Sequence, residues 1–352
     1  MRLEARDSVS RAAAIGAPLG AVAVTLAICA VLVRWAGAPV FASFGALLDG
    51  GFGSRFAVTE TLTRATPLIF TGLAAAVAFR ARFFNIGAEG QLYLGALAAV
   101  AVGAELGAVT GLPPVVSFIA MIVAAALAGS LWLAIAALLR TRLAVDEVVT
   151  TLLTNFVVLL FVSWMLDGPM KDPAAMGWPQ SVSLPPELEL TKLIERTRLH
   201  TGFAVALGCA VAMWAISKFT TFGFEARAVG ANAQAARFAG IHVDATVIKT
   251  ALLSGALAGL AGAVEVAGRT SYVTLDMSPG YGYAGIVVAM LAALHPLAVV
   301  PAAIFIAGMF VGADSMSRAV GVPTYIADVI VAVSLLAVLV ATQLLRYRIR
   351  WR

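Results

Sequence analysis

The stretch FNIGAEGQ, residues 84–91, places an amide, a carboxylate and a second amide between two apolar runs. The run before it ends near Phe79, and the run after it extends from Leu92 to Val102. In a chain otherwise built for lipid, polar side chains must face protein or water, because hydrocarbon offers them no hydrogen-bond partners. The stretch therefore predicts either a contact with a transported solute or a fixed contact between helices.

The composition of the chain predicts a membrane protein. Its 352 residues are 61% hydrophobic and only 12% charged, with a mean hydropathy of +0.95. A helix needs roughly 20 apolar residues to cross a hydrocarbon core about 30 Å thick, and such runs recur from end to end of the chain. We predict an all-α, polytopic bundle of about ten transmembrane helices, forming a single transmembrane domain over residues 1–352. The predicted spans lie near residues 14–33, 59–79, 86–104, 114–139, 146–166, 202–218, 247–267, 280–294, 297–313 and 324–344.

The distribution of positive charge predicts the orientation, because loops rich in Lys and Arg stay on the cytoplasmic side. Fifteen of the 24 Lys and Arg residues fall in segments that we place inside, including those near both chain ends. Both termini are therefore predicted to be cytoplasmic, in a multi-pass protein of the inner (plasma) membrane. The net charge of +5 fits contact with anionic lipid, whereas nucleic-acid binding is not expected, since no basic run is interleaved with aromatic residues.

Two outer segments interrupt the apolar pattern. Residues 35–58 are rich in glycine and are expected to form an external loop that partly re-enters the membrane. Residues 167–200 carry five prolines and are predicted to be the largest extracytoplasmic loop. This second loop is either a docking surface for a partner or a solvated linker.

The largest inner segment, residues 219–246, is rich in alanine and too polar to cross a bilayer. It predicts a short cytoplasmic helix or helix pair between Gly223 and Gly240, with an ordinary connecting loop as the alternative. Small side chains let another backbone approach closely, so the segment suits docking into a groove on a cytoplasmic protein. The residues that we assign to this coupling contact are Glu225, Arg227, Gly230, Asn232, Gln234, Arg237 and Gly240.

A polar stripe enters the fifth predicted span. Glu147, Thr151 and Asn155 are spaced four residues apart and lie on one helix face. A polar stripe inside a membrane faces the interior of the bundle, where it lines a path for a hydroxylated solute or bonds to neighbouring helices. Both interpretations remain open from the residues alone.

Glycines in the segment SGALAGLAGAVEVAG, residues 254–268, predict close helix packing. Signals for catalysis are missing from the sequence. No Gly-Lys pair exists to form a phosphate-binding loop, the three histidines lack metal-ligand spacing, and no nucleophile and base stand at a recognisable spacing. We expect no catalytic residue, metal or cofactor, and if ATP drives the protein, a separate partner must hydrolyse it.

Four segments carry a family resemblance, in the order TLTRATPLIFTGLAAAVAFRARFFNIGAEGQLYLGA, DEVVTTLLTNF, FEARAVGANAQAARFAGI and YGYAGIVVAMLAA. Together they resemble the permease subunits of ABC importers for nucleosides and related sugars, within the wider ribose and branched-chain amino-acid permease family. The resemblance covers the chain from about Thr59 to Ala313. One departure is Arg82, where the family pattern suggests a small residue.

The resemblance implies a set of partners and a mechanism. Similar permeases pair with a second permease, here expected to be a different chain, receive solute from an extracytoplasmic binding protein, and dock a cytoplasmic ABC ATPase on the long inner loop. Transport by alternating access is then expected, with amides and hydroxyls suiting a neutral polyhydroxyl solute. Our candidates for the solute path are Asn85, Glu89, Gln91, Thr151 and Asn155. The amides at positions 85 and 91 have an alternative role in stabilising the bend between the second and third spans.

Two other functions remain open at this point. An ion-coupled secondary transporter would use Glu89, Glu265 or Asp314 to carry a proton or sodium ion. Within the ABC class, the solute is either a nucleoside or related sugar, or a branched-chain amino acid.

Overall fold

The computed structural model describes residues 2–5, 26–106, 111, 113–323, 325–326, 329, 331–333, 336–337, 340 and 347–350. The chain forms two compact units, one of residues 62–303 and one of residues 1–61 together with 304–352. Each unit is described by itself.

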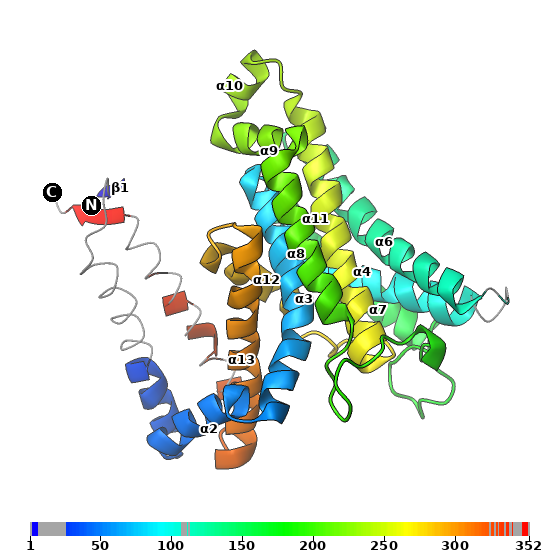
Figure 1. Ribbon diagram of the computed structural model, residues 1–352, viewed down its shortest axis with the longest axis vertical. Coiled ribbons are helices and arrows are strands. Elements are labelled where there is room, and N and C mark those ends of the chain that lie inside the picture. Colours follow the sequence, from blue (N-terminus) through cyan, green and yellow to red (C-terminus); the bar gives the residue numbers. More distant parts are fainter. Residues whose placement is uncertain are drawn as a thin grey trace. The chain divides into compact units, whose positions relative to one another are not determined.

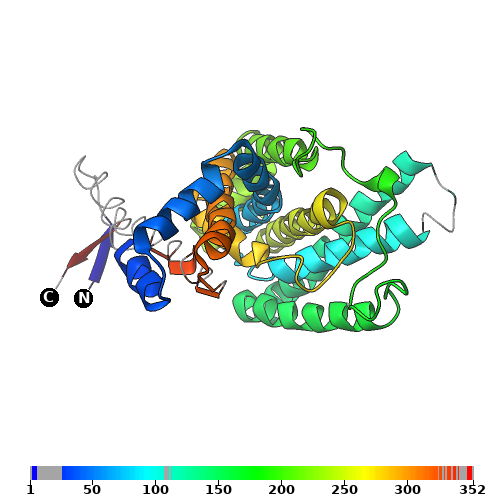
Figure 2. The same cartoon turned by 90° about the horizontal axis from the view of Figure 1, so that it is seen from below.

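Three closely packed helices form the centre of the larger unit: α4 (Ala88–Val100), α6 (Pro114–Leu143) and α11 (Val243–Glu265). A Cβ atom added to Gly259 would lie 2.2 Å from the carbonyl oxygen of Ala125, and one added to Gly262 would lie 1.9 Å from that of Leu92. The close packing expected of the α11 glycines is therefore confirmed, since no larger residue fits at these crossings. Figure 2 shows α11 in yellow beside α4 in cyan.

The other helices of this unit surround the centre. Asp146 caps the N-terminus of α7, accepting hydrogen bonds from the backbone N–H groups of Val148 and Val149 at 2.8 and 3.0 Å. The bounds are α3 (Arg55–Arg80, in this unit from Leu62), α7 (Glu147–Asp167), α8 (Gly202–Phe219), α9 (Thr221–Ala231), α10 (Ala233–Phe238), α12 (Tyr281–Leu291), two π-helical turns, η1 (Ala101–Leu106) and η3 (Val266–Thr270), and a 3-10 turn, η2 (Pro186–Leu188).

The segment 167–200 is bound by backbone hydrogen bonds to the residues that follow η3. The N–H of Ser181 donates to the carbonyl of Val273 at 3.1 Å, and the N–H of Leu184 donates to that of Ser271 at 2.7 Å. Because these bonds fix its backbone, the segment is an ordered layer in this structure and does not resemble a free linker.

The smaller unit contains a bent helix pair. Helix Leu26–Trp35 and helix α2 (Val40–Phe52) meet at 114°. A Cβ on Gly51 would lie 2.6 Å from the carbonyl oxygen of Gly308, so α2 packs closely on the part of α13 (Pro296–Val320) that belongs to this unit. Most of the glycine-rich stretch 35–58, expected as an external loop that partly re-enters the membrane, is helical.

The two ends of the chain pair as a short antiparallel ribbon, β1 (Arg2–Ala5) with β2 (Tyr347–Arg350). Apart from this ribbon, the regular structure of the described residues is helical, as the all-α prediction requires.

Six helices within the described ranges are long and apolar enough to cross a membrane, or seven if the bent pair counts as one span. They match the spans predicted near 59–79, 114–139, 146–166, 202–218, 247–267 and 297–313. The spans predicted near 86–104 and 280–294 correspond to shorter helices, Ala88–Ala104 and Tyr281–Leu291, and an 11-residue helix covers only about 16 Å. The predicted spans 14–33 and 324–344 lie partly outside the described residues. The protein is thus a multi-pass helical membrane protein, and the count of ten stays a prediction.

Candidate solute path and coupling surface

Residues 84–87 of the polar stretch form a tight turn that leads from α3 into α4, and residues 88–91 begin α4 (Figure 1). Arg82 precedes it with a left-handed backbone, at a φ of 52°. The N–H of Gly87 donates to the side-chain oxygen Oδ1 of Asn85 at 3.0 Å, as short polar side chains commonly allow in turns. The turn is therefore stabilised in part by its own residues.

The buried amides of Asn85 and Gln91 bond to each other twice, at 2.9 Å in both directions. Asn85 Nδ2 also donates to Ser254 Oγ on α11 at 3.1 Å. Ser254 Oγ in turn donates to the carbonyl of Ala74 on α3 at 2.8 Å. These contacts join α3, α4 and α11 around the turn, as the structural alternative for the two amides requires.

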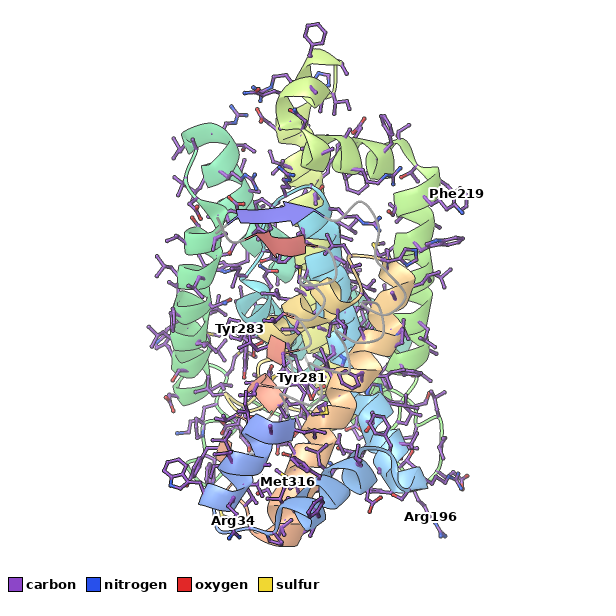
Figure 3. The ribbon with its side chains drawn as sticks, turned by 90° about the vertical axis from the view of Figure 1, so that its left-hand side faces the viewer. Arg34, Arg196, Phe219, Tyr281, Tyr283 and Met316 are labelled. Atoms are coloured by element: carbon purple, nitrogen blue, oxygen red, sulfur yellow. The ribbon has the colours of Figure 1, made fainter. Side chains whose placement is uncertain are left out.

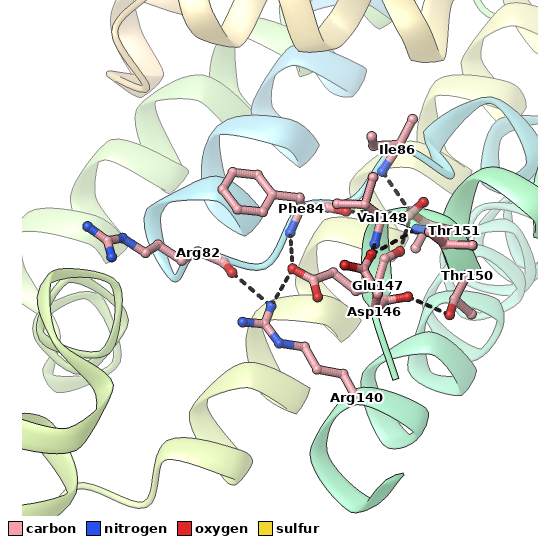
Figure 4. Close-up of polar contacts among 10 residues, drawn as sticks. Arg82, Phe84, Ile86, Arg140, Asp146, Glu147, Val148, Thr150 and Thr151 are labelled. Carbon is pink, nitrogen blue, oxygen red and sulfur yellow. Dashed lines mark hydrogen bonds and ion pairs between the residues drawn. The ribbon is translucent and has the colours of Figure 1, made fainter. Parts of the chain in front are cut away.

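The polar stripe of the fifth predicted span lies on the buried face of α7 and meets the same turn (Figure 4). The N–H of Phe84 donates to Glu147 Oε1 at 3.3 Å, and the N–H of Ile86 donates to Thr151 Oγ1 at 3.1 Å. The stripe therefore supplies acceptors to backbone N–H groups that the turn leaves without helical partners. Its orientation toward the interior of the bundle is confirmed.

Asn155 extends this contact by one further turn of α7. Its Oδ1 accepts from the N–H of Gly90 at 2.9 Å, and its Nδ2 donates to the carbonyl of Ile86 at 3.0 Å and to the hydroxyl of Tyr283 at 3.1 Å. The side chain is almost fully buried. Asn155 thus connects α7 to both α4 and α12.

Arg140 holds the turn from the end of α6. Its Nη1 donates to Glu147 Oε1 and to the carbonyl oxygen of Arg82, both at 2.8 Å (Figure 4). Its guanidinium also lies 5.5 Å from the centre of the Phe83 ring. One arginine therefore links the backbone of the turn, a carboxylate of α7 and an aromatic ring.

Glu89 faces α12 on the other side of α4. Its Oε2 accepts from the N–H of Gly282 at 2.6 Å, and the carboxylate is buried. A Cβ added to Gly282 would lie only 2.2 Å from the backbone nitrogen of Glu89, so glycine is required for this approach. With Glu89 included, the structure brings all five residues predicted for the solute path into one buried network around the turn.

Tyr283 is the residue of this region that the sequence analysis did not single out. Its side chain is 39% exposed, whereas the five candidates are almost fully buried, and its hydroxyl accepts the hydrogen bond from Asn155. Figure 3 labels it on α12 together with Tyr281. Tyr283 therefore presents an aromatic face and a hydroxyl beside the buried network. The segment YGYAGIVVAMLAA contains it, but the exposure of one tyrosine follows from helix packing alone.

The inner segment forms the helix pair α9–α10 at one end of the larger unit (Figure 1). Thr220 Oγ1 caps α9 by accepting from the N–H of Gly223 at 3.1 Å. Asn232 Oδ1 caps α10 by accepting from two backbone N–H groups at 3.0 Å, and Gly240 follows its end with a φ of 85°. The prediction of a short helix pair is confirmed, and Asn232 and Gly240 have local structural roles in it.

Gly230 lies directly against the C-terminal end of α3. A Cβ at this position would lie 1.8 Å from the carbonyl oxygen of Arg80. Arg227 donates to the carbonyl of Ser217 at the end of α8, and Glu225 Oε2 accepts from Thr246 Oγ1 on α11 at 3.3 Å. Helix α9 is therefore attached to three helices of the bundle.

On α10, Gln234 is exposed and Arg237 forms an exposed ion pair with Asp244 at 3.5 Å. The sequence analysis missed Phe238, the last residue of α10, whose side chain is 97% exposed. A phenylalanine with so little contact to its own chain suits insertion into a partner. Sequence alone could have identified Phe238, because a single phenylalanine in an alanine-rich polar helix is unusual enough to suggest a contact residue.

Buried charge elsewhere in the larger unit is paired. Glu265 lies at the end of α11 and forms an ion pair with Arg269, which also lies 3.5 Å from the hydroxyl of Tyr281. In the part of the chain that the structure describes, no three His, Cys, Asp or Glu side chains gather to hold a metal ion.

Comparisons with known proteins agree with this architecture. Residues 57–339 match the family described as branched-chain amino acid transport system / permease component. The guanosine ABC transporter permease protein NupP of Bacillus subtilis is 37% identical over 94% of both chains. The glucose ABC transporter permease protein TsgB13 of Haloferax volcanii is 36% identical over 99% of this chain and 93% of its own. The nucleoside ABC transporter permease protein NupB of Lactococcus lactis is 29% identical over 81% of this chain and 80% of its own.

In two of these organisms a second permease protein, NupQ in Bacillus and NupC in Lactococcus, is also similar to this chain. These relatives are transport components and not enzymes. The match over most of the chain and the relatives above 30% identity show that this protein belongs to the permease component family of branched-chain amino acid transport systems, among the permeases of ABC transporters.

Proposed function

We propose that the chain is the membrane-spanning permease subunit of an ATP-driven ABC importer, which carries a nucleoside or a related sugar by alternating access. The observation that carries this proposal is the helix pair α9–α10. It offers the exposed Phe238 to a partner, and it is attached through Gly230 to the end of α3, next to the polar turn.

This attachment suggests how a partner moves the solute path. The carbonyl of Arg80, which meets Gly230, lies two residues before Arg82, whose own carbonyl is held by Arg140. A displacement of α9 by a cytoplasmic ATPase would therefore reach the turn directly. The turn is bonded to α7, α11 and, through Glu89, to α12, so these helices would shift with it.

In the solute path we assign two kinds of role. Asn85, Glu89, Gln91, Thr151 and Asn155 hold the helices in register and have protein partners in this conformation. Tyr283 offers its exposed ring and hydroxyl, which suit a nucleobase or sugar face. Amides freed by a conformational change would satisfy hydroxyl groups of a neutral solute without a counter-charge.

The remaining partners follow from the family. We propose that the chain acts as one permease domain, pairs with a second permease, and receives solute from an extracytoplasmic binding protein at the ordered loop 167–200. Its place is the plasma membrane, with segment 219–246 in the cytoplasm. The names of the relatives that occur twice in one organism support a paired permease. Pairing of β1 with β2 supports both termini being on one side.

The ion-coupled alternative is disfavoured by the surroundings of its acids. Glu89 accepts a backbone hydrogen bond, and Glu265 is paired with Arg269.

Uptake of radiolabelled guanosine by cells expressing the full set of subunits separates the ABC importer from the ion-coupled transporter. We expect vanadate to abolish uptake and a protonophore to leave the initial rate unchanged. Uptake of labelled leucine in place of guanosine would support the branched-chain amino-acid alternative.

Co-purification tests the coupling surface. The tagged chain would be expressed with its candidate ATPase and second permease, comparing wild type with Phe238→Ala and Gly230→Trp. We expect both changes to reduce ATPase recovery at least tenfold. Phe238→Ala removes an aromatic anchor, which is worth about 2 kcal/mol or more when it is buried in a partner. Gly230→Trp displaces α9, because its side chain would meet the carbonyl of Arg80. Trp178→Ala, an exposed aromatic in the outer segment 167–200, is the matched control and should retain the complex. Equal ATPase recovery in all variants would refute the assignment.

A further inference from the structure

Two arginines converge at the junction of α3, α8 and α9. Arg80 donates from its Nη1 to Ser217 Oγ, and Arg227 donates from its Nη1 to the carbonyl of the same serine. Their positive charges act on each other. Each guanidinium carries five N–H donors, and the contacts with Ser217 use one from each. Both therefore retain most of their capacity to bind an anion.

Acids on the neighbouring elements are engaged elsewhere. Glu225 of α9 accepts from Thr246, Asp244 of α11 pairs with Arg237, and Glu147 of α7 pairs with Arg140. Within the described ranges, no ion pair is found for either Arg80 or Arg227. A cluster of two like charges without a counter-ion is unfavourable unless a bound anion compensates it.

Arg80 borders an apolar recess, and Ala226, which precedes Arg227, also lines it. The lining comes from α3, α8, α9, α11 and the first residue of α13, and it consists mainly of small and apolar side chains, including Val77, Met213, Ile216, Phe222 and Leu253. The recess has a volume of about 30 Å³, so it accepts a few methylene groups at most.

The neighbouring residues mark the level of a membrane surface. The ammonium of Lys218 lies 5.2 Å from the Trp214 ring and 5.3 Å from the Phe219 ring, and Phe219 projects outward at the end of α8 (Figure 3). Trp with a basic residue at the end of an apolar helix is typical of the interface between hydrocarbon and water. Ser217, on which both arginines converge, directly precedes Lys218, so the pair lies at the level of lipid headgroups.

From these observations we infer that Arg80 and Arg227 form a binding site for the phosphate of an anionic phospholipid, a few of whose methylene groups enter the apolar recess. Phosphate matches the planar donor fork of arginine, and the recess and the interfacial aromatics favour a lipid over a free anion. Because Gly230 contacts the backbone of Arg80, the bound lipid would brace α9 against the bundle.

The test measures lipid binding by the purified full chain without transport or ATPase. Phosphatidylglycerol would be titrated against a constant background of phosphatidylcholine in nanodiscs, with bound lipid and thermal stability as readouts. Wild type should enrich phosphatidylglycerol and be stabilised by it. We expect Arg80→Gln or Arg227→Gln to weaken its binding about fivefold, and the double variant about 25-fold, since each basic residue near a membrane surface contributes about 1 kcal/mol.

The control variants distinguish a specific lipid site from general electrostatic attraction between the basic protein and anionic lipid. Arg142→Gln removes an exposed charge at the end of α6 and should bind phosphatidylglycerol like wild type. If a Gln variant does not fold, Arg80→Lys and Arg227→Lys keep the charge but lose the planar donor fork, and each should weaken phosphatidylglycerol binding measurably but by less than fivefold. An equal loss with Arg142→Gln, or inorganic phosphate stabilising the chain as well as the lipid does, would overturn the inference. Neither readout needs transport. The proposed importer function can therefore fail while the lipid site is confirmed, and the lipid site can fail while the importer function is confirmed.

Discussion

Arg82 stands at a backbone position that favours glycine. Its φ of 52° places a Cβ-bearing residue in the left-handed region immediately before the polar turn. The left-handed conformation is a physical reason to expect a small residue at this position, as the resemblance does. The carbonyl of Arg82 is held by Arg140, and that bond compensates part of the strain.

A pair of substitutions tests this explanation. Arg82→Gly should be neutral or stabilise the protein by up to about 1 kcal/mol, because it removes the steric cost of the left-handed conformation. Arg82→Val should destabilise it by about 1–2 kcal/mol, because a β-branched residue fits this conformation poorly. Both variants lose the same positive charge, so thermal unfolding in one detergent isolates the backbone effect. A lower midpoint for the glycine variant than for the valine variant would contradict it.

His200 is a buried histidine outside the spanning helices, at the end of segment 167–200. Its ring fits between two glycines: a Cβ on Gly202 would lie 2.7 Å from Nδ1, and one on Gly268 would lie 2.3 Å from Nε2. Neither ring nitrogen has a hydrogen-bond partner among the described residues. Burial therefore favours the neutral ring and lowers the pKa of His200 to about 4.

This pKa makes stability depend on pH. The unfolded chain binds a proton at His200 below about pH 6.5, whereas the folded chain does so only near pH 4, so stability falls as the pH is lowered between these values. Between pH 7 and pH 5 we expect wild type to lose about 2 kcal/mol more than His200→Gln does. Unfolding midpoints at the two pH values provide the measurement. His242→Gln, at an exposed position, should behave like wild type.

Among the elements, α4 and α11 depend on glycine at their crossing. Gly262→Ala should cost about 1–3 kcal/mol, because its Cβ would meet the backbone carbonyl of Leu92, which cannot move without separating the helices. Gly208→Ala on α8 is the matched control, since no atom lies within 4 Å of its Cβ position. It should be neutral or stabilise the protein by up to about 1 kcal/mol through helix propensity. Thermal unfolding compares the two, and similar midpoints would show that the helices tolerate a wider crossing.

The α9–α10 pair, which we propose as the coupling surface, is built from capped helices, and α9 is closely attached to the bundle. The residues that sequence analysis assigned to ATPase contact divide into two groups in the structure. Gly230, Arg227 and Glu225 attach α9 to the bundle, whereas Gln234 is exposed on α10. Phe238, which the sequence analysis missed, belongs with the second group, since it is exposed at the end of α10. A motion of the pair would therefore be transmitted by the first group and received by the second.

At the scale of the whole molecule, the orientation proposed from charge can be measured. Met176 in segment 167–200 and Phe238 in segment 219–246 are both 97% exposed. In a chain with Cys29 and Cys209 replaced by serine, a cysteine would be placed at one of these positions at a time. In intact cells, a membrane-impermeant maleimide should label only Met176→Cys; in inverted vesicles, only Phe238→Cys. The opposite pattern would reverse the topology and remove the cytoplasmic coupling surface.

Several features followed from the sequence because they depend on local composition and spacing. Hydrophobic runs predicted a helical membrane protein, four-residue spacing placed Glu147, Thr151 and Asn155 on one face, and the alanine-rich inner segment predicted a helix pair. Each of these depends on residues within a few turns of one another, where helix geometry decides the outcome. Even the alternative role of Asn85 and Gln91 in stabilising the bend was accessible, because the two residues lie on one turn and its following helix.

Only the tertiary structure decided which of these residues meet. Asn85 bonds to Ser254 across 169 positions of the chain, Glu89 bonds to Gly282 across 193, and Arg80 shares Ser217 with Arg227. No periodicity in one segment encodes contacts that depend on how several helices pack. Exposure also depends on how the helices pack, since the five path candidates are buried whereas Tyr283 and Phe238 are exposed. Burial and pairing are properties of the assembled bundle, because the neighbouring helices determine which face of each helix is buried.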